Sequence, residues 1–350
     1  MINLYSAQIE SLFIHKIGNK SRNEGVLLND NPTALSDEMM PLFKEFFFKP
    51  FREKEEKYLK FTHEIDLDYN QINVIASEIF NKNKNTARGL SIARMLYEQS
   101  THPHIKAGEL YICHITNIVV DNVKTDAVGI FKSEIKQDFL KFAEQGNHLE
   151  MILSQGVNLN KLDKGCLILN IEAEQGYKVL SVDTNRYDTK YWMDDFLGVV
   201  EFEDSRFQTK KYLKFCQDFA KDVVNPAEDK KEEVMFMNRA MNHFASRDDF
   251  EETAFLNDVM ENPDLIPEFK HYKEERAPKY SIQDLTSFPI SNEAVSDSRK
   301  KFKGVINLDT NVSIKMDFVS QQKADKIVEK GWDAERGQYF YLVYFNQEVK

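Results

Sequence analysis

Lysines and arginines that could bind phosphate gather at three places in this 350-residue chain. Lysine and arginine hold phosphate through their charge and several N–H donors, and such contacts position a protein on nucleic acid without reading its sequence. The simpler interpretation of each group is an ordinary solvated surface, because most surface lysines bind no ligand. The groups are Arg299, Lys300, Lys301 and Lys303; Lys210, Lys211 and Lys214; and Lys132, Lys136 and Lys141.

A second pattern could support hydrolysis of nucleic acid. Asp126 precedes Glu134-Ile-Lys136, and metal-dependent nucleases place a carboxylate ahead of such a Glu-x-Lys. There, two carboxylates hold Mg²⁺ and the lysine orients or activates the attacking water. So short a match also arises by chance. We favour the simpler interpretation of a turn aspartate and a solvated helix start, and we therefore predict no catalytic residue and no metal site.

Other signatures of enzymes and metal sites are missing from the sequence. His102 and His104 could supply two metal ligands, but no cysteine or carboxylate cluster follows at a fitting spacing. His15 and His114 fall within predicted strands, where core or edge histidines are the simpler interpretation. There is no GxGxxG, P-loop, HExxH or GxSxG motif, and no helix-turn-helix or zinc finger. We expect no cofactor and no reading of base sequence.

The composition constrains where and how the chain works. Its formal charge of −11 and pI of about 5.4 argue against a uniformly basic surface. Fourteen acidic and seven basic residues between Pro226 and Arg276 account for −7 of that charge. The widely spaced Cys113, Cys166 and Cys216 predict buried thiols in a reducing compartment. With no signal peptide and no apolar run of about 20 residues, we expect a soluble cytoplasmic protein without membrane contact.

The elements that must position these groups follow from apolar periodicity. The strands predicted at 109–120 and 126–134 form a hairpin, and apolar residues on both faces of the first make it central in a sheet covered on both sides. The remaining expectations come from helical or alternating spacing. We predict helices at 71–80, 88–100, 133–143, 207–223, 234–244, 250–260 and 291–301, and strands at 9–17, 165–171, 177–182, 312–318 and 339–345.

These elements predict an α+β fold in two domains. Asn225-Pro226, followed by a highly charged run, marks the boundary. We expect a larger mixed domain at 1–225, with the central β-hairpin, and a smaller domain at 226–350 that is helical and acidic first and rich in strands afterwards. The acidic stretch from Glu228 to Met260 is predicted to be a helical interaction surface, since its carboxylates would repel phosphate.

The order of several phrases along the chain resembles the bacterial nucleoid-associated protein family of the NdpA/YejK type. The resemblance implies a non-enzymatic protein that associates with the bacterial chromosome and contacts type II topoisomerases. It covers nearly the whole chain and is strongest before Val224. The phrases are a strand with His15 and a loop with Asn31-Pro-Thr33, Gly108-Glu-Leu-Tyr, Ala127-Val-Gly-Ile-Phe-Lys-Ser, Tyr191-Trp-Met-Asp-Asp-Phe-Leu-Gly, and Phe302-Lys-Gly-Val-Ile-Asn-Leu.

One departure from the family's proteobacterial branch affects the binding residues. That branch carries a strongly basic segment before the Phe-Leu-Gly phrase, whereas this chain has only Arg186 and Lys190 there. We predict a homodimer that associates with double-stranded chromosomal DNA in the nucleoid, largely independently of sequence. Its phosphate contacts would come from these two residues and from the groups around Lys210 and Lys300. The alternatives are recruitment to DNA by a type II topoisomerase or another nucleoid protein, and a Mg²⁺-dependent nuclease.

Overall fold

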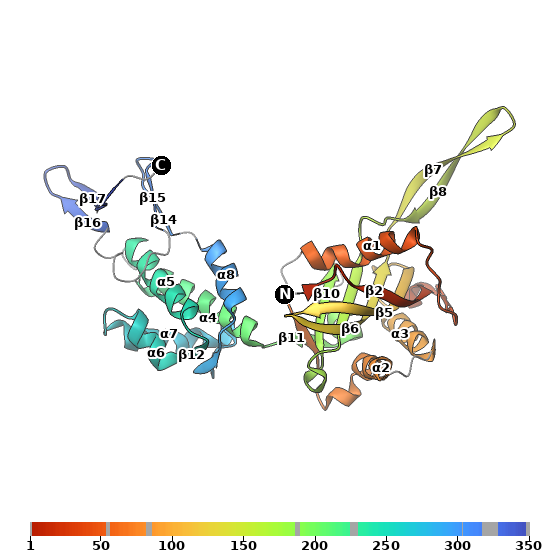
Figure 1. Ribbon diagram of the computed structural model, residues 1–350, viewed down its shortest axis with the longest axis horizontal. Helices are drawn as coiled ribbons and strands as arrows, with labels where there is room; N and C mark the ends of the chain where they lie inside the picture. The colour runs from red at the N-terminus through yellow and green to blue at the C-terminus, as the bar shows by residue number, and fades with distance from the viewer. Residues whose placement is uncertain are drawn as a thin grey trace. The chain divides into compact units, whose positions relative to one another are not determined.

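The computed structural model describes residues 2–53, 57–81, 86–185, 190–224, 230–302, 304–316 and 328–347. The chain divides into two compact units, Met1–Phe202 and Glu203–Lys350 (Figure 1). Both combine helices with antiparallel strands, which confirms the predicted α+β class. The division falls before the boundary predicted at 225/226, because the helix expected to close the first domain contributes its apolar face to the core of unit 2.

Within the described residues, unit 1 is built on a nine-stranded antiparallel sheet in the order β11-β4-β10-β9-β6-β5-β2-β3, with β1 pairing to β5. The predicted hairpin is β5–β6, and β5 lies between β2 and β6 in the interior of the sheet, as expected. The strands are β1 (Ile2–Asn3), β2 (Gln8–Ile17), β3 (Val26–Leu27), β4 (Leu59–Phe61), β5 (Gly108–Val120), β6 (Val123–Ser133), β9 (Lys164–Leu169), β10 (Lys178–Asp183) and β11 (Val199–Glu201).

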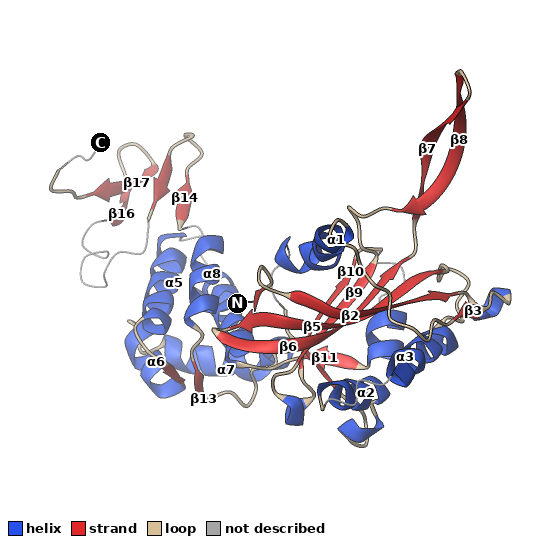
Figure 2. Cartoon of the chain, turned by 45° about the vertical axis from the view of Figure 1, so that its right-hand side comes forward, coloured by secondary structure: helices blue, strands red, loops and turns tan. Residues whose placement is uncertain are grey.

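Helices cover both faces of this sheet, as Figure 2 shows: α1 (Met39–Glu53) lies on one face, and α2 (Gln71–Phe80) and α3 (Thr86–Gln99) on the other. Because successive side chains of β5 point to opposite faces of the sheet, this strand contributes to the core on both faces. Ile112 joins the core beneath α2 and α3, and Tyr111 joins the core beneath α1. On the α1 side, Phe47 stacks on Phe131 with ring centroids 4.2 Å apart. Both faces of the central strands are therefore buried, as the sequence predicted.

The helix predicted at 133–143 is wrong. Strands β7 (Lys136–Gln145) and β8 (His148–Val157) instead form a two-stranded hairpin that projects from the body of unit 1 (Figure 1). Ile135, Phe139 and Phe142 match a helical stripe, but the segment also alternates, and β8 offers it a partner strand. The two-residue turn with Gly146 at φ 61° closes the hairpin, and a Gly-Asn pair between alternating stretches is the sequence signal for it.

The aromatic phrase after β10 forms a π-helical turn, η4 (Tyr191–Leu197). Trp192 is fully buried, and its Nε1 donates a hydrogen bond to Ser181 Oγ at 3.0 Å. Gly198 ends the turn at φ 62°, a left-handed conformation that glycine adopts without strain. The residues that carry the family resemblance here serve the packing of unit 1.

Unit 2 is a helical body with short strand pairs. Among the described residues, no helix of either unit combines the length and apolar character that crossing a membrane requires. Helix α7 was not predicted. The elements are α4 (Ser205–Phe219), which continues as the π-helical η5 (Ala220–Val224), α5 (Lys230–Ala245), α6 (Glu252–Val259), α7 (Leu265–Tyr280) and α8 (Asn292–Lys301), and the pairs β12 (Asp249–Glu251) with β13 (Ser287–Pro289), β14 (Val305–Asn307) with β15 (Ser313–Lys315), and β16 (Val328–Asp333) with β17 (Gln338–Val343).

Helix α5, which makes up half of the acidic stretch, is a core element and not an exposed surface, whereas the interaction role of the stretch stays a prediction. Helix α5 is the core helix of unit 2, and it buries Val234, Phe236 and Phe244 almost completely. Its carboxylates are also used internally: Glu233, which is buried, pairs with Lys230 on the same helix. A high local acidic count therefore coexists with a buried helix, because the carboxylates of α5 lie in its first turn and the apolar residues run along its length.

Candidate nucleic-acid interface

Helix α4 presents two of the predicted phosphate-binding lysines. Asp204 caps its start, accepting a hydrogen bond from Phe207 N at 2.9 Å. Tyr212 and Phe215 face the core of unit 2, so Lys210 and Lys214, one turn apart, share the opposite side of the helix. The side chain of Lys214 is 56% exposed and that of Lys210 is 25% exposed.

Helix α8 brings the second basic group to the same place. Ser291 Oγ accepts from Ala294 N at 3.3 Å and caps the helix, as predicted for 291–301. Arg299, Lys300 and Lys301 occupy its last turn, where positive charge also suits the negative end of the helix dipole. Helices α4 and α8 pack against each other, so two basic groups about ninety residues apart in sequence become neighbours.

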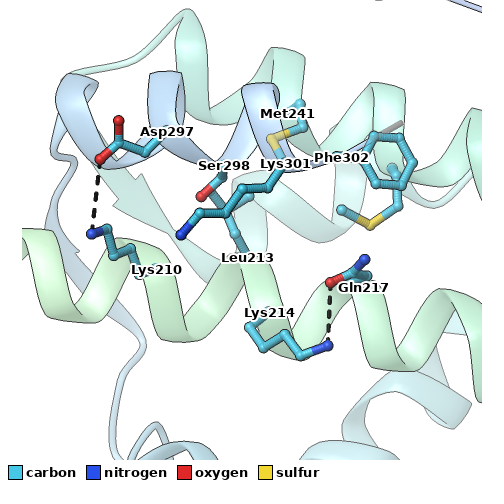
Figure 3. Close-up of a pocket in the computed structure, with 10 residues that line it drawn as sticks. Lys210, Leu213, Lys214, Gln217, Met241, Asp297, Ser298, Lys301 and Phe302 are labelled. Carbon is cyan, nitrogen blue, oxygen red and sulfur yellow. Dashed lines mark hydrogen bonds and ion pairs between the residues drawn. The ribbon is translucent and has the colours of Figure 1, made fainter. Parts of the chain in front are cut away.

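A pocket of about 210 Å³ lies where these helices meet α5 (Figure 3). Lys301 extends from α8 across the pocket toward α4; Lys210 reaches up from α4 toward Asp297, and Lys214 runs along α4 toward Gln217. The floor is apolar, with Leu213, Met237 and Met241 among its residues. The full lining is Lys210, Leu213, Lys214, Gln217, Met237, Met241, Asp297, Ser298, Lys301 and Phe302. An apolar floor with a cationic rim suits an anionic group.

Carboxylates moderate the positive charge of the rim. Asp297 accepts a hydrogen bond from Arg206 at 3.1 Å and lies 3.9 Å from Lys210, so two cations share one carboxylate. Lys214 donates to Asp218 at 2.7 Å. Burial alone would raise the pKa of Asp218, but hydrogen bonds from Lys214 and Tyr280 hold it below its ordinary value. The lining itself holds three lysines and one carboxylate, and the rim keeps net positive charge.

Several predicted residues lie elsewhere. Arg299 turns inward, and its Nη2 donates to Met241 O at 3.5 Å and to Asn242 Oδ1 at 3.3 Å. Lys211 lies over the Phe207 ring, 4.9 Å from its centroid. Lys300 is exposed on α8.

Two more predicted residues, Arg186 and Lys303, fall outside the part of the chain that the structure describes. The last, Lys190, is exposed at the start of η4 in unit 1. The basic groups on α4 and α8 thus reduce to a rim of three lysines, with Lys300 beside it.

The third basic group, in unit 1, does not form one exposed surface. Lys132 is fully buried, and its Nζ donates to Glu134 Oε1 at 2.8 Å and to Lys106 O at 2.9 Å. Burial alone would lower the pKa of Lys132, yet contact with Tyr191 and the Glu134 carboxylate raises it above the ordinary value. Lys136 pairs with Glu109, and Lys141 lies over the Phe139 ring. These lysines stabilise unit 1 and its hairpin.

The nuclease hypothesis fails on geometry. Asp126 lies 3.4 Å from His114 near one end of β6, and Glu134 follows the other end of that strand. Eight residues of extended chain separate the two carboxylates by about 26 Å, whereas one metal ion needs both within reach. Among the described residues, no group of three His, Cys, Asp or Glu side chains converges on a metal-sized site.

Sequence reasoning found the lysines but missed the pocket that unites them. Its floor residues, Met237 and Met241, lie on a helix that we had assigned to an exposed surface. One usable signal was present: Asp297 and Lys301 are four residues apart on the predicted helix 291–301, so both had to lie on one side of it.

Comparison with known proteins assigns the chain to a family. No curated protein matches it. The family model described as nucleoid-associated protein YejK matches residues 13–336, which includes the whole sheet of unit 1 apart from its first residues and both helices that form the lysine rim. The chain therefore belongs to the YejK family of nucleoid-associated proteins.

Proposed function

We propose that the protein associates non-enzymatically with double-stranded DNA of the bacterial nucleoid, largely independently of sequence, through the lysine rim of unit 2. One observation carries the proposal: Lys210 and Lys214 on α4 and Lys301 on α8 line a single pocket. Their ammonium groups suit phosphate oxygens, which every DNA sequence presents alike. Asp218 and Asp297 lie beside the lysines, so the expected affinity is weak to moderate.

The test is a titration of a DNA duplex with the purified full chain at several salt concentrations. Replacing Lys210, Lys214 and Lys301 together with glutamine should weaken binding equally on unrelated sequences. If each lysine neutralises one phosphate, the slope of log K against log salt should flatten by about 2.7 units, since each lysine accounts for ~0.9. Glutamine retains polarity, and a thermal melt checks the fold.

A matched control removes the same charge from the same unit. Lys221, Lys270 and Lys279 are exposed in unit 2 and do not line the pocket. The variant with these three replaced by glutamine should bind almost as the wild type does, with nearly the same salt slope. Equal losses in the two triple variants would mean that net charge, and not the rim, governs binding.

A second observation favours recruitment through another protein, such as a type II topoisomerase. The hairpin β16–β17 exposes Trp332 by 54% and Tyr339 by 70%, with ring centroids 4.7 Å apart. Exposed aromatic side chains are frequent anchors of protein interfaces. If recruitment dominates, Trp332→Ala with Tyr339→Ala should displace the protein from the nucleoid in cells while leaving duplex binding in vitro unchanged. Retained localisation would exclude this hairpin as the anchor.

A further inference from the structure

The pocket between α4 and α8 has an apolar floor that phosphate binding does not explain. The floor is formed by Leu213 of α4, Met237 and Met241 of α5, and Phe302 just after α8. The first three belong to the core of unit 2, and Phe302 packs against that core, so the floor is preformed. A phosphate gains nothing from such a surface, because apolar side chains cannot replace the hydrogen bonds that it makes to water.

The size and the side chains of the pocket suit a single ring. Its volume of about 210 Å³ exceeds the ~150 Å³ of an apolar cavity that binds benzene. A six-membered ring with a few polar substituents therefore fits. Two methionines and a phenylalanine line the pocket, and thioether sulfur atoms make favourable contacts with aromatic rings. An aromatic guest is thus the apolar ligand that these residues favour.

Two polar side chains of the lining keep hydrogen-bonding groups for such a guest. Gln217 Oε1 accepts from Lys214 Nζ at 3.2 Å, which leaves the amide N–H donors of Gln217 without a partner among the described residues. The hydroxyl of Ser298 makes no side-chain hydrogen bond within the same residues. Both side chains are half-buried. Nucleobases carry carbonyl and amino groups on their edges, and proteins read an unstacked base through hydrogen bonds to such groups.

Two lysines of the lining, Lys214 and Lys301, are exposed, and Lys301 extends across the pocket toward α4 (Figure 3). A lysine side chain is a flexible four-carbon stem, so Lys301 can turn its ammonium group to a phosphate and uncover the floor beneath it. The lining thus combines an apolar floor, hydrogen-bond donors and cations. This combination matches a ring joined to a phosphate, which is a nucleotide.

We propose that the pocket takes one unpaired nucleotide of a DNA strand, with the base on the apolar floor and the phosphate on the rim lysines. A base within a duplex is paired and stacked, so it cannot enter, whereas an unpaired base can turn out of its strand. The pocket therefore gives the protein a preference for single-stranded segments of chromosomal DNA. This inference rests on the proposed function, because the same lysines hold the phosphate, and it adds the base as a second ligand group.

The experiment compares two single strands of equal length and charge by fluorescence anisotropy with the full chain. One strand is oligothymidylate, and the other has the same sugar-phosphate backbone without bases, so both present the same phosphates. The thymine strand should bind about tenfold more tightly, since one stacked base contributes an effect of this order in other single-strand sites. Equal affinities for the two strands overturn the proposal.

Filling the pocket should remove this preference. Ser298→Phe sets a ring into the pocket and retains all the lysines, so the thymine strand should then bind only as tightly as the strand without bases. Ser296 lies on the same helix, is exposed and does not line the pocket. Ser296→Phe is therefore the matched control, and it should keep the tenfold difference. Thermal melts check both folds, and a folded Ser298→Phe variant that still prefers the thymine strand contradicts the proposal.

Methionine methyl resonances report occupancy of the pocket in the wild-type chain. An aromatic base changes the resonance of a methyl group that it covers, so the thymine strand should shift the signal of Met241, which Met241→Leu assigns. The strand without bases should leave this signal in place. A Met241 signal that stays unshifted at saturation with the thymine strand shows that no base reaches the floor.

A competition experiment distinguishes a DNA strand from a free nucleotide, which carries the same base and phosphate. Thymidine monophosphate should displace the thymine strand only weakly, because it offers a single phosphate to the lysines, and inorganic phosphate should displace it still less. Displacement by the monophosphate at concentrations comparable to the strand would assign the pocket to free nucleotides instead. A failed proposed function is recognised separately, because the Lys210/Lys214/Lys301 variant would then bind duplex as the wild type does, whereas failure of this inference leaves the loss of duplex binding intact.

Discussion

Lysines of unit 1 and of unit 2 differ in their burial and in their partners. In unit 1, Lys132 is fully buried against Glu134 and Lys164 against Asp183, with N–O distances of 2.8 and 2.9 Å. Both ammonium groups lie 5.7 Å from the centroid of the Tyr191 ring. In unit 2, Lys210, Lys214 and Lys301 surround an open pocket. The former stabilise a fold, and the latter can exchange their partners for an external anion.

The difference arises from the secondary structure that carries each lysine. A strand covered on both faces buries every side chain, so a lysine on β6 or β9 needs a carboxylate within the protein. A helix at the surface buries only one side and leaves the lysines of the other side to solvent. In both units the lysines lie beside carboxylates. The type of secondary structure that carries a lysine therefore decides whether it is available to DNA.

Separating the units gives the largest expected contrast. A chain ending at Phe202 should fold and fail to bind duplex DNA, whereas Glu203–Lys350 should fold and bind it. A chain ending at Val224, near the boundary that the sequence predicts, should aggregate because α4 would expose Tyr212 and Phe219 without the rest of their core. Circular dichroism and a duplex titration check the three chains. A soluble, cooperative fold for the chain ending at Val224 would support the boundary predicted at 225/226.

Breaking the buried Lys132–Glu134 pair should give the next largest effect, a loss of stability in unit 1. Lys132→Met leaves Glu134 charged without its partner, and removal of one member of a buried pair destabilises by about 3–5 kcal/mol. Unfolding of unit 1 in urea measures the loss. Lys132→Met with Glu134→Gln should recover part of it, because no uncompensated charge remains. Duplex binding under native conditions should not change, and a matching loss of affinity would contradict the separation of roles.

The parts of the fold that were predicted are those governed by local pattern. Helix 71–80 and the β5–β6 hairpin follow from apolar periodicity, and the capped helix 291–301 follows from Ser291 and its polar sequence. Segment 133–143 was misassigned because Ile135, Phe139 and Phe142 fit a helical stripe, whereas the decisive strand partner lies beyond Gly146. Pairing with β8 prevailed over a short local stripe.

The candidate site could be predicted only in part, for the same reason. Each basic group could be located from the sequence, but their union at one pocket depends on α4 packing against α8, a contact between segments about ninety residues apart. The inward turn of Arg299 was equally hidden. Its spacing from Lys300 suggests one shared surface, whereas its side chain reaches the carbonyl of Met241 on α5.

Arg299 and Lys300, adjacent in sequence, should therefore respond differently to the same substitution. Arg299→Gln removes hydrogen bonds to the end of α5 and should destabilise unit 2 by about 1–3 kcal/mol, with little effect on the salt slope of DNA binding. Lys300→Gln should leave the melting temperature unchanged and flatten that slope by at most ~0.9. Thermal melts and duplex titrations separate the two effects. A flatter slope in the Arg299 variant would place its guanidinium on the DNA.

The smallest expected effect is the contribution of buried His15 to the pH dependence of the stability of unit 1. Burial lowers the pKa of His15 below its ordinary 6.5, with Asp30 opposing the shift only partly, and Nδ1 accepts from Asn29 N at 3.1 Å. Below pH 6.5 the unfolded chain takes up a proton that folded His15 resists. The unfolded state then binds more protons, so stability falls as pH drops through that value toward the lower folded pKa, and stays constant above it. His15→Gln should make the urea midpoint of unit 1 less dependent on pH across this window. An equal loss of midpoint in the wild type and the variant would show that other groups, and not His15, set the acid sensitivity of unit 1.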